Sequence, residues 1–404
     1  MYVAVKGGEK AVKNTRDLVA KNRRGDLRVP RLSLDQITNQ LGLGVDRVMA
    51  EGSLYDRFAA AAAVRQAQGD LTEAVFLLRA LRTTLKRFGT SVPVQTTEMT
   101  AFRRVSGIFK DIPGGQVLGP TYDYTLRLIE PDSDPDLEDG RNADRDEDRH
   151  SGQNDMDHIS LDGPGRHHRN TPRPGRPTAD DPGSPPPGGL PRVIDILQAQ
   201  GLMTPNQPVS LQDASGDITR QPLTFPAPRS VRLQALARGD EGFSLGAAYS
   251  LQRGFGLDRH PFLGELKVGY VSVRYTPPEL GFEIHIGRVT LTECTMVNRQ
   301  DGAGSHPAGF ETGYGLVFGQ NERKAMSMSL LDRSLSTSEK TGNVAYPAQD
   351  PEFVLSHCDS VESSGFVQHL KLPHYVDFQS ELVFIRNRRK EQAPDQGNID
   401  APDL

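Results

Sequence analysis

The clearest pattern in the chain is an apolar stripe between residues 71 and 88. Its members recur at steps of three and four, as on one face of an α-helix, and they are Leu71, Ala74, Val75, Leu78, Leu81, Leu85 and Phe88. Asp70 precedes the stripe and Glu73 follows three residues later, which is an N-terminal capping pattern. An alanine run at residues 59–63 before Gly69 predicts a second helix, and residues 33–49 predict a third. We therefore expect residues 1–130 to form a helical N-terminal region.

A second pattern, the alternation of apolar and polar positions, appears beyond residue 260. Residues 266–275 and 282–297 alternate in this way, and the loop-forming residues 277–281 separate them, so we expect two antiparallel strands. The remaining expected elements are short helices at 322–334 and 352–357, another ended by Gly365, an extended run over 366–372 and a helix over 376–390. The predicted class is thus α+β, with a mixed α/β C-terminal region at residues 193–404.

Between these regions, residues 131–192 differ in composition from the rest of the chain. Ten acidic side chains lie between Glu130 and Asp148, and nine prolines lie between Pro164 and Pro191. No Phe, Tyr or Trp occurs at positions 131–192. Such a segment cannot bury enough apolar surface to offset its conformational entropy, so we expect a disordered acidic and proline-rich insert.

Composition limits the kinds of partner and the cellular location that we expect for the chain. The 404 residues carry a formal net charge of −5, which gives no reason to expect nucleic-acid binding. No apolar run approaches the ~20 residues that a membrane helix needs, and lysines interrupt the N-terminus where a signal peptide would need an apolar core. Cys294 and Cys358 form neither a disulfide framework nor a cysteine cluster, so we expect a cytoplasmic chain that holds no iron–sulfur cluster by itself.

A glycine-rich run in the second half is a candidate phosphate-binding segment. Gly313, Gly315 and Gly319 lead into Arg323 and Lys324 at an expected helix start. Backbone N–H groups at glycines and at the positive end of a helix can bind phosphate, and the two cations would add charge. The order of residues is not that of a P-loop, and a tight turn of a strand explains the run equally well.

Two adjacent carboxylates, Asp240 and Glu241, are the candidate catalytic groups. They lie in a glycine-flanked bend between Arg238 and Gly242. An ionised carboxylate in such a bend can bind a cation such as magnesium. A solvated loop accounts for the same residues, and the sequence does not decide which carboxylate would act.

A histidine pair near the C-terminus is the candidate metal site. His369 and His374 lie five residues apart, with Pro373 directly before the second. On one helix, residues five apart point about 140° away from each other, so the imidazoles can converge only across a turn. Two converging imidazoles are half of a Zn²⁺ site. The alternative is two unrelated histidines beside a helix start.

Six segments, spread over the chain outside the insert, resemble one protein family. They are residues 1–10 (Met1-Tyr-Val-Ala-Val-Lys-Gly-Gly-Glu-Lys10), 110–124, 238–242, 313–319, 322–326 and 369–379 (His369-Leu-Lys-Leu-Pro-His374-Tyr-Val-Asp377-Phe-Gln). Their order and spacing are similar to those of the nucleosidase-like I subunit of the bacterial carbon–phosphorus lyase core complex. This is a subunit family of α-D-ribose 1-methylphosphonate 5-triphosphate synthase, which acts in phosphonate catabolism.

The resemblance implies a reaction and a set of partners. An alkylphosphonate such as methylphosphonate would displace adenine from MgATP, and the chain alone would act as a purine ribonucleoside triphosphate nucleosidase. His369 and His374 would bind zinc shared with a partner subunit, in a hetero-oligomer that includes the radical iron–sulfur subunit. No nucleic-acid or membrane partner is implied. The alternative is a non-catalytic scaffold that donates zinc ligands to the radical partner.

Overall fold

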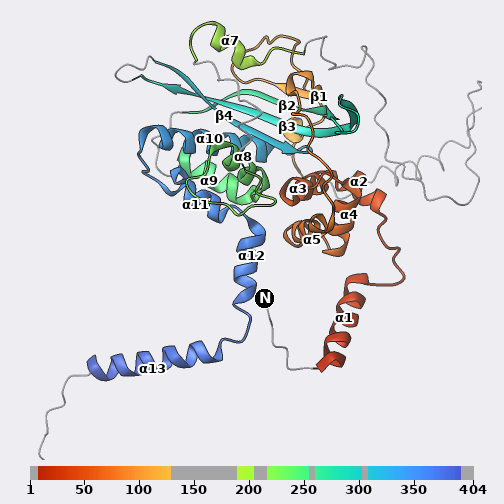
Figure 1. Cartoon of the computed structure of the whole chain (residues 1–404), viewed down its shortest axis with the longest axis vertical. Coiled ribbons are helices and arrows are strands. Elements are labelled where there is room, and N and C mark those ends of the chain that lie inside the picture. Colours follow the sequence, from red (N-terminus) through yellow and green to blue (C-terminus); the bar gives the residue numbers. More distant parts are fainter. Residues whose placement is uncertain (1–7, 129–188, 204–215, 254–259, 303–307, 393–404) are drawn as a thin grey trace, which may run out of the picture.

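The computed structural model describes residues 8–128, 189–203, 216–253, 260–302 and 308–392. Over these residues the chain is α+β, as the sequence predicted: helices surround one antiparallel sheet with the strand order β1-β2-β3-β4 (Figure 1). The insert predicted at residues 131–192 lies outside the described residues, apart from its last four positions.

Four helices near the N-terminus form a helical unit: α2 (Leu34–Gln40), α3 (Gly42–Gly52), α4 (Arg57–Gln66) and α5 (Leu71–Thr84). Their facing apolar sides form a separate core, because Val45, Met49 and their neighbours are fully buried. The expected cap of α5 is confirmed, since the Asp70 side chain accepts a hydrogen bond from the N–H of Glu73 at 3.2 Å. The single helix expected over residues 33–49 is wrong. The chain breaks at Leu41, where the glycine-containing start of α3 has low helix propensity.

The sheet joins the two halves of the chain. Strand β1 (Thr100–Val105) pairs with β2 (Phe262–Tyr275), which pairs with β3 (Ile284–Gln300), and β3 pairs with β4 (Gly309–Phe318). Strands β2 and β3 confirm the two expected antiparallel strands. Strand β1 corrects the prediction that residues 1–130 are helical. Its Arg104 forms a buried ion pair with Glu265 of β2 at 2.7 Å, a long-range contact that the local sequence does not reveal.

Helices cover one face of this sheet. They are α8 (Arg229–Arg238), α9 (Glu241–Arg253), α10 (Glu322–Thr341) and α11 (Pro351–His357), with the 3-10 turn η4 (Pro347–Gln349) (Figure 1). The largest apolar core lies between them and the sheet and includes Leu266, Cys294 and Leu331. Helix α10 is longer than the expected 322–334. On the other face lie α7 (Val193–Ala199) and η1 (Thr96–Glu98), and η2 (Tyr122–Tyr124) lies near the end of the first described range.

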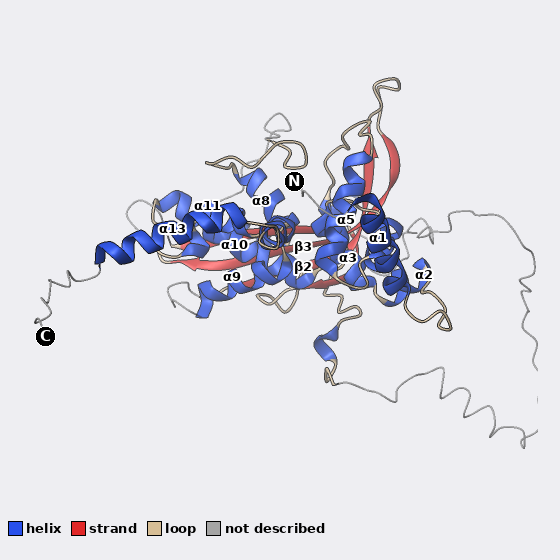
Figure 2. Cartoon of the chain, turned by 90° about the horizontal axis from the view of Figure 1, so that it is seen from below, coloured by secondary structure: helices blue, strands red, loops and turns tan. Residues whose placement is uncertain are grey.

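The last two helices form a C-terminal arm, α12 (Ser360–His369) and α13 (Tyr375–Gln392), which extends away from the body (Figures 1 and 2). Neither helix contains a buried residue. The extended run expected over residues 366–372 is wrong, because α12 starts at the Asp359 cap and continues through Gly365 to His369. Helix α1 (Gly8–Arg24) also stands apart from the body with no buried residue. None of the helices in the described ranges is both long and apolar enough to cross a membrane.

Candidate functional site

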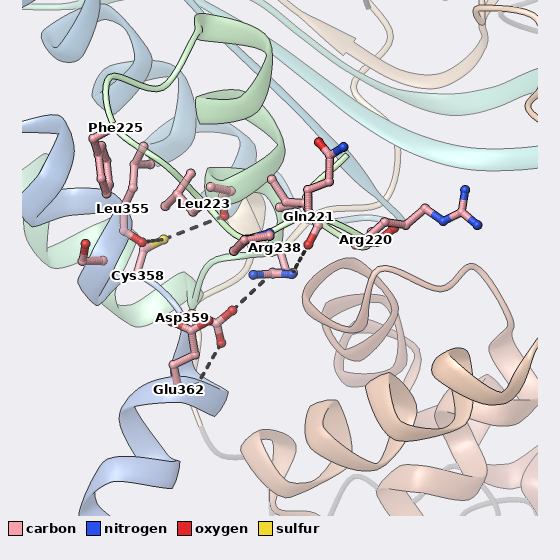
Figure 3. A pocket seen from close by; sticks show the side chains of 14 residues that line it. Arg220, Gln221, Leu223, Phe225, Arg238, Leu355, Cys358, Asp359 and Glu362 are labelled. Atoms are coloured by element: carbon pink, nitrogen blue, oxygen red, sulfur yellow. Dashed lines mark hydrogen bonds and ion pairs between the residues drawn. The ribbon is translucent and has the colours of Figure 1, made fainter. Parts of the chain in front are cut away.

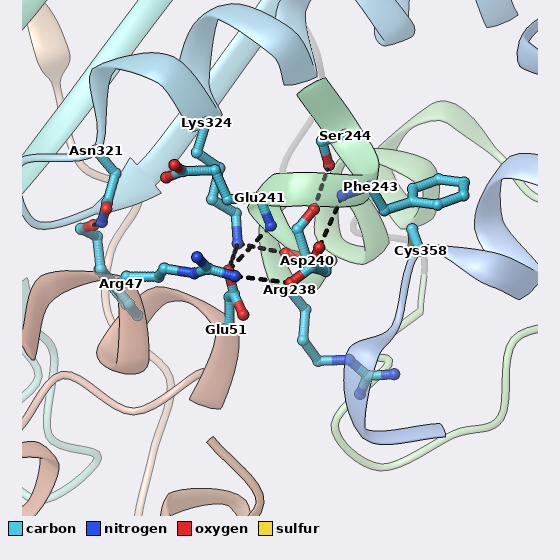
Figure 4. Close-up of polar contacts among 12 residues, drawn as sticks. Arg47, Glu51, Arg238, Asp240, Glu241, Phe243, Ser244, Asn321, Lys324 and Cys358 are labelled. Atoms are coloured by element: carbon cyan, nitrogen blue, oxygen red, sulfur yellow. Dashed lines mark hydrogen bonds and ion pairs between the residues drawn. The ribbon is translucent and has the colours of Figure 1, made fainter. Parts of the chain in front are cut away.

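A network of charged side chains joins the helical unit to the helices on the sheet (Figure 4). Arg47 of α3 donates to Glu51 at 2.9 Å and to Asp240, in the α8–α9 connection, at 2.7 Å. Glu51 is almost fully buried and also accepts the N–H of Glu241 at 3.1 Å. The network therefore fixes the bend that carries both candidate carboxylates against the end of α3.

Lys324 of α10 is a buried member of this network. Its side chain is fully buried, and Nζ donates to the carbonyl of Gly239 at 2.6 Å and lies 3.6 Å from a carboxylate oxygen of Glu51. Burial lowers the pKa of Lys324, and the charge of Glu51 opposes that shift. Lys324 is thus an internal partner of the network and does not face solvent.

The two candidate carboxylates differ in accessibility. The Asp240 side chain is 23% exposed, whereas that of Glu241 is 8% exposed. One Asp240 oxygen accepts the N–H of Phe243 at 2.7 Å and caps α9, and the other accepts from Arg47. Glu241 pairs with Arg323 at 3.0 Å. Asp240 is therefore the carboxylate that a ligand can reach more readily.

The glycine-rich run has a different role from the one the sequence predicted. Gly313 and Gly315 lie within β4, where a Cβ atom would come 1.8 Å from the carbonyl oxygen of Ser329 and 2.1 Å from that of Ala325. Both glycines therefore let the strand pack directly against the backbone of α10. They form neither a phosphate loop nor a turn, because this face of the strand is filled by the helix.

The start of α10, which we expected to bind phosphate, is occupied by groups of the chain itself. The Asp46 carboxylate of α3 accepts the N–H of Gln320 at 2.9 Å, and the hydroxyl of Thr292 accepts that of Asn321 at 2.9 Å. Gly319 adopts a left-handed conformation with φ +72°, and a Cβ there would come 2.4 Å from Asp46. An internal carboxylate thus takes the place at this helix end that an external anion would need.

Arg323 and Lys324 point in different directions, which corrects the expectation that they act together on one phosphate. Arg323 is 76% exposed and reaches Glu241, whereas Lys324 is buried. Neighbouring residues on a helix are separated by about 100°, so their side chains point in different directions.

The structure brings the two predicted metal ligands together. The Nε2 atoms of His369 and His374 lie 3.2 Å apart, with the ring planes at 88°. The Nδ1 atom of His374 lies 2.6 Å from the carbonyl oxygen of Leu372. Because a carbonyl only accepts, this Nδ1 carries the proton, and a neutral His374 presents the lone pair of Nε2 to its partner. The short turn between α12 and α13 thus orients one imidazole as a ligand.

No third ligand completes this pair within the described part of the chain, where no group of three or more His, Cys, Asp or Glu side chains gathers at a metal-binding distance. Cys358 is buried, and burial raises the pKa of its thiol to about 12. It is therefore a neutral thiol, held in the body of the protein next to Gly239.

The residues of α3 that organise the site are not among those predicted from the sequence. Asp46, Arg47 and Glu51 come from a helix that is otherwise apolar, and two of the three are more than nine-tenths buried. A signal was present, because charged residues on an otherwise apolar, buried helix require partners elsewhere in the fold. The identity of those partners depends on contacts across about 190 residues.

The family model described as "Bacterial phosphonate metabolism protein (PhnI)" matches residues 1–392. The chain belongs to this family. A relative from Rhizobium meliloti (strain 1021), named alpha-D-ribose 1-methylphosphonate 5-triphosphate synthase subunit PhnI, is 51% identical over 391 residues, or 97% of this chain and 95% of the relative. A relative of the same name from Escherichia coli (strain K12) is 47% identical, over 97% of this chain and 99% of the relative.

A third relative, from Stutzerimonas stutzeri, is 41% identical over 99% of both chains and is named provisionally as C-P lyase subunit protein HtxH. These names support the predicted place of the chain in phosphonate metabolism, as a subunit of a carbon–phosphorus lyase-related complex. They also support a catalytic role within that complex, since the first two relatives are named as synthase subunits.

Proposed function

We propose that this chain displaces adenine from MgATP with an alkylphosphonate, such as methylphosphonate, to give α-D-ribose 1-methylphosphonate 5-triphosphate. The observation that carries the proposal is the 51% identity, over 97% of the chain, to a relative whose name states this product. In the reaction a phosphonate oxygen bonds to the anomeric carbon while the bond from that carbon to the purine nitrogen breaks. The purine leaves with the bonding electrons and takes up a proton, and the triphosphate stays on the sugar.

This exchange develops positive charge on the ribose ring, so a nearby carboxylate stabilises the transition state. Asp240 suits this role better than Glu241, because its side chain is the more exposed of the two. Arg47, at 2.7 Å, holds one Asp240 oxygen in place. In the absence of phosphonate and partners, water can attack the same carbon, which would make the chain a purine ribonucleoside triphosphate nucleosidase.

His369 and His374 fit a zinc site. Two nitrogens bound tetrahedrally to one Zn²⁺ at about 2.0–2.1 Å lie about 3.3 Å apart, close to the 3.2 Å between the two Nε2 atoms. His369 is exposed and His374 half-buried at the bend of the C-terminal arm, so a partner subunit can supply further ligands. Zinc held there would supply positive charge for a phosphate or phosphonate oxygen. We assign the partner's role to the radical iron–sulfur subunit, and place the complex in the cytoplasm, where free cysteines stay reduced.

The second candidate function is that of a scaffold that donates zinc ligands and has no catalysis of its own. The observation in its favour is the C-terminal arm, whose side chains are unburied although many are apolar. The exposed apolar residues of the arm are Phe366, Val367, Leu370, Tyr375, Val376, Phe378, Val383, Phe384 and Ile385. A large exposed apolar surface is typical of a binding interface.

One assay separates the two functions. The purified chain is incubated with MgATP or MgGTP, and the free base is detected by chromatography. The proposed function predicts slow release of adenine and guanine, lowered at least tenfold in Asp240→Asn, with no loss in the matched surface variant Asp301→Asn. If wild-type protein releases no base, the chain alone is not a nucleosidase and the scaffold function is favoured.

A further inference from the structure

Glu51, near the end of α3, is the most deeply buried of the three carboxylates around the bend that carries Asp240, with 1% of its side chain exposed. Its contacts converge on one oxygen, Oε1, which accepts from Nε of Arg47 at 2.9 Å and from the N–H of Glu241 at 3.1 Å (Figure 4). Nζ of Lys324 lies 3.6 Å from the same atom. A single buried oxygen therefore contacts groups of α3, α9 and α10.

Arg47 connects this buried oxygen to the Asp240 side chain. While its Nε donates to Glu51, its Nη2 donates to Oδ2 of Asp240 at 2.7 Å. A guanidinium is planar with donors in a fixed arrangement, so fixing Nε also fixes the direction of Nη2. Burial alone would lower the pKa of Arg47, but the charges of Glu51 and Asp240 raise it above its usual value, and Arg47 stays a cation. The position of Oδ2 thus depends on Glu51.

The backbone of the bend is held by hydrogen bonds at three successive groups. The carbonyl of Gly239 accepts from Lys324 at 2.6 Å, and the N–H of Asp240 donates to the carbonyl of Cys358 at 2.6 Å. The next N–H along the chain is the one that Glu51 accepts. Loss of the Glu51 carboxylate would therefore remove the acceptor of one of these groups, directly beside Asp240, and the negative charge nearest to the buried Lys324.

These polar contacts matter because the bend borders open space on one side. Arg238, directly before the bend, and Cys358, which accepts from it, both line a cavity of about 510 Å³ at the junction of α11 with α12 (Figure 3). Side chains that line a void lack packing partners on that side. The position of the bend consequently depends more on its hydrogen bonds than it would in a fully packed interior.

We propose that Glu51 is a positioning residue for the exchange reaction, holding Asp240 at the ribose through Arg47 and through the N–H of Glu241. The inference rests on the proposed function, which places Asp240 beside the ribose ring. A carboxylate stabilises developing charge only from the right place, and a displacement of about 1 Å can lower a rate about 100-fold. Lys324 then provides the opposite charge for Glu51 and has no contact with the triphosphate.

Three variants of the full chain test this role through the kinetics of base release from MgATP. Glu51→Ala removes the acceptor and should lower kcat roughly 10–100-fold while KM for ATP stays near wild type. Glu51→Gln keeps an oxygen acceptor for both donors and should restore most of the lost kcat. Val64→Ala is the control for stability, because it removes packing from the core of the same helical unit outside this network, and it should keep the wild-type kcat. Equal losses of kcat in Glu51→Ala and Val64→Ala would overturn the positioning role.

Amide hydrogen exchange over residues 239–243 tests the positioning itself without relying on activity. In Glu51→Ala these amides should exchange at least about tenfold faster than in wild type, and in Glu51→Gln at nearly the wild-type rate. Unchanged exchange in Glu51→Ala would overturn the inference, and so would faster exchange with a wild-type kcat.

The inference and the proposed function can fail separately. If the wild-type chain alone releases no base, the nucleosidase claim fails, and the variants are compared for adenine release in the assembled complex with MgATP and methylphosphonate. Wild-type adenine release by a complex that contains Glu51→Ala would overturn the positioning role while leaving the exchange reaction intact. A 10–100-fold loss there, with most of it restored in Glu51→Gln, would support the role although the isolated chain is inactive.

Discussion

Arg79 of α5 donates to both carboxylate oxygens of Asp359 at 2.7 Å, across 280 residues of sequence. Arg79 also donates to the carbonyl of Glu51 at 2.9 Å. Asp359 in turn caps α12 by accepting the N–H of Val361 at 2.9 Å. The helical unit thus fixes the start of the C-terminal arm that carries the histidine pair, and one ion pair couples the helical unit to this arm.

Removing this ion pair should destabilise the protein. Arg79→Ala leaves the buried Asp359 carboxylate with only Arg238 as a cationic partner, and we expect the free energy of unfolding to fall by about 3 kcal/mol. Urea denaturation measures the change. The matched control is Arg274→Ala on β2, whose pair with Glu98 is half-exposed and should contribute under about 1 kcal/mol. Equal losses of unfolding free energy in the two variants would show that the Arg79–Asp359 pair does not stabilise the fold.

The same carboxylate should make stability depend on pH. Burial alone would raise the pKa of Asp359, but the charge and hydrogen bond of Arg79, together with Arg238, lower it below its usual value. A lowered carboxyl pKa stabilises the fold above the unfolded value of about 4 and loses that contribution as pH falls further. The melting temperature of wild-type protein should therefore drop more steeply below pH 4 than that of Asp359→Asn. Parallel curves of melting temperature against pH for the two proteins would contradict the lowered pKa of Asp359.

The glycines of β4 should be required for folding. A Cβ at Gly313 or Gly315 would overlap the α10 backbone, so each Gly→Ala change should lower the free energy of unfolding by about 1–3 kcal/mol or more. Gly246 in α9 is the control, because nothing lies within 4 Å of its added Cβ, and alanine there should stabilise the helix by about 0.5–1 kcal/mol. Thermal melts that show Gly315→Ala to be neutral would return the run to a ligand-binding role.

The histidine pair should bind metal but contribute little to the stability of the fold. His369→Ala or His374→Ala should remove zinc from the assembled complex and leave the melting temperature of the isolated chain within a few degrees of wild type, since the C-terminal arm has no buried residue. His285→Ala on β3 is the control and should keep the metal. Elemental analysis decides the point, and full zinc occupancy in both arm variants would end the zinc proposal.

The elements that the sequence predicted correctly are those that depend on local spacing. The capped stripe beginning at Asp70 and the alternating strands β2 and β3 needed only period and turn residues. The local sequence does not predict strand β1, because its buried Arg104 pairs with Glu265 and with the carbonyl of Pro191, both more than 80 residues away. The prediction of an extended run over residues 366–372 depends on Gly365 as a helix end, but α12 continues through this glycine.

In the candidate site, too, the sequence predicts the features that depend on local spacing and not those that depend on distant contacts. His369 and His374 could be placed together, because five residues and one proline determine their turn. Three residues of the predicted phosphate-binding segment have packing roles instead, because Gly313 and Gly315 pack against the backbone of α10 and Lys324 lies buried beside Glu51. No local pattern separates a packing glycine from a phosphate-binding one.

The most direct test of the central claim is the exchange reaction itself in the assembled complex. MgATP and methylphosphonate are supplied, free adenine is measured by chromatography, and the phosphorus-containing products are identified by ³¹P NMR. We predict one adenine released for each methylphosphonate ester formed at the anomeric carbon, with the triphosphate intact and the product lost in Asp240→Asn. Release of phosphate or pyrophosphate without adenine, or no ester at all, would contradict the account.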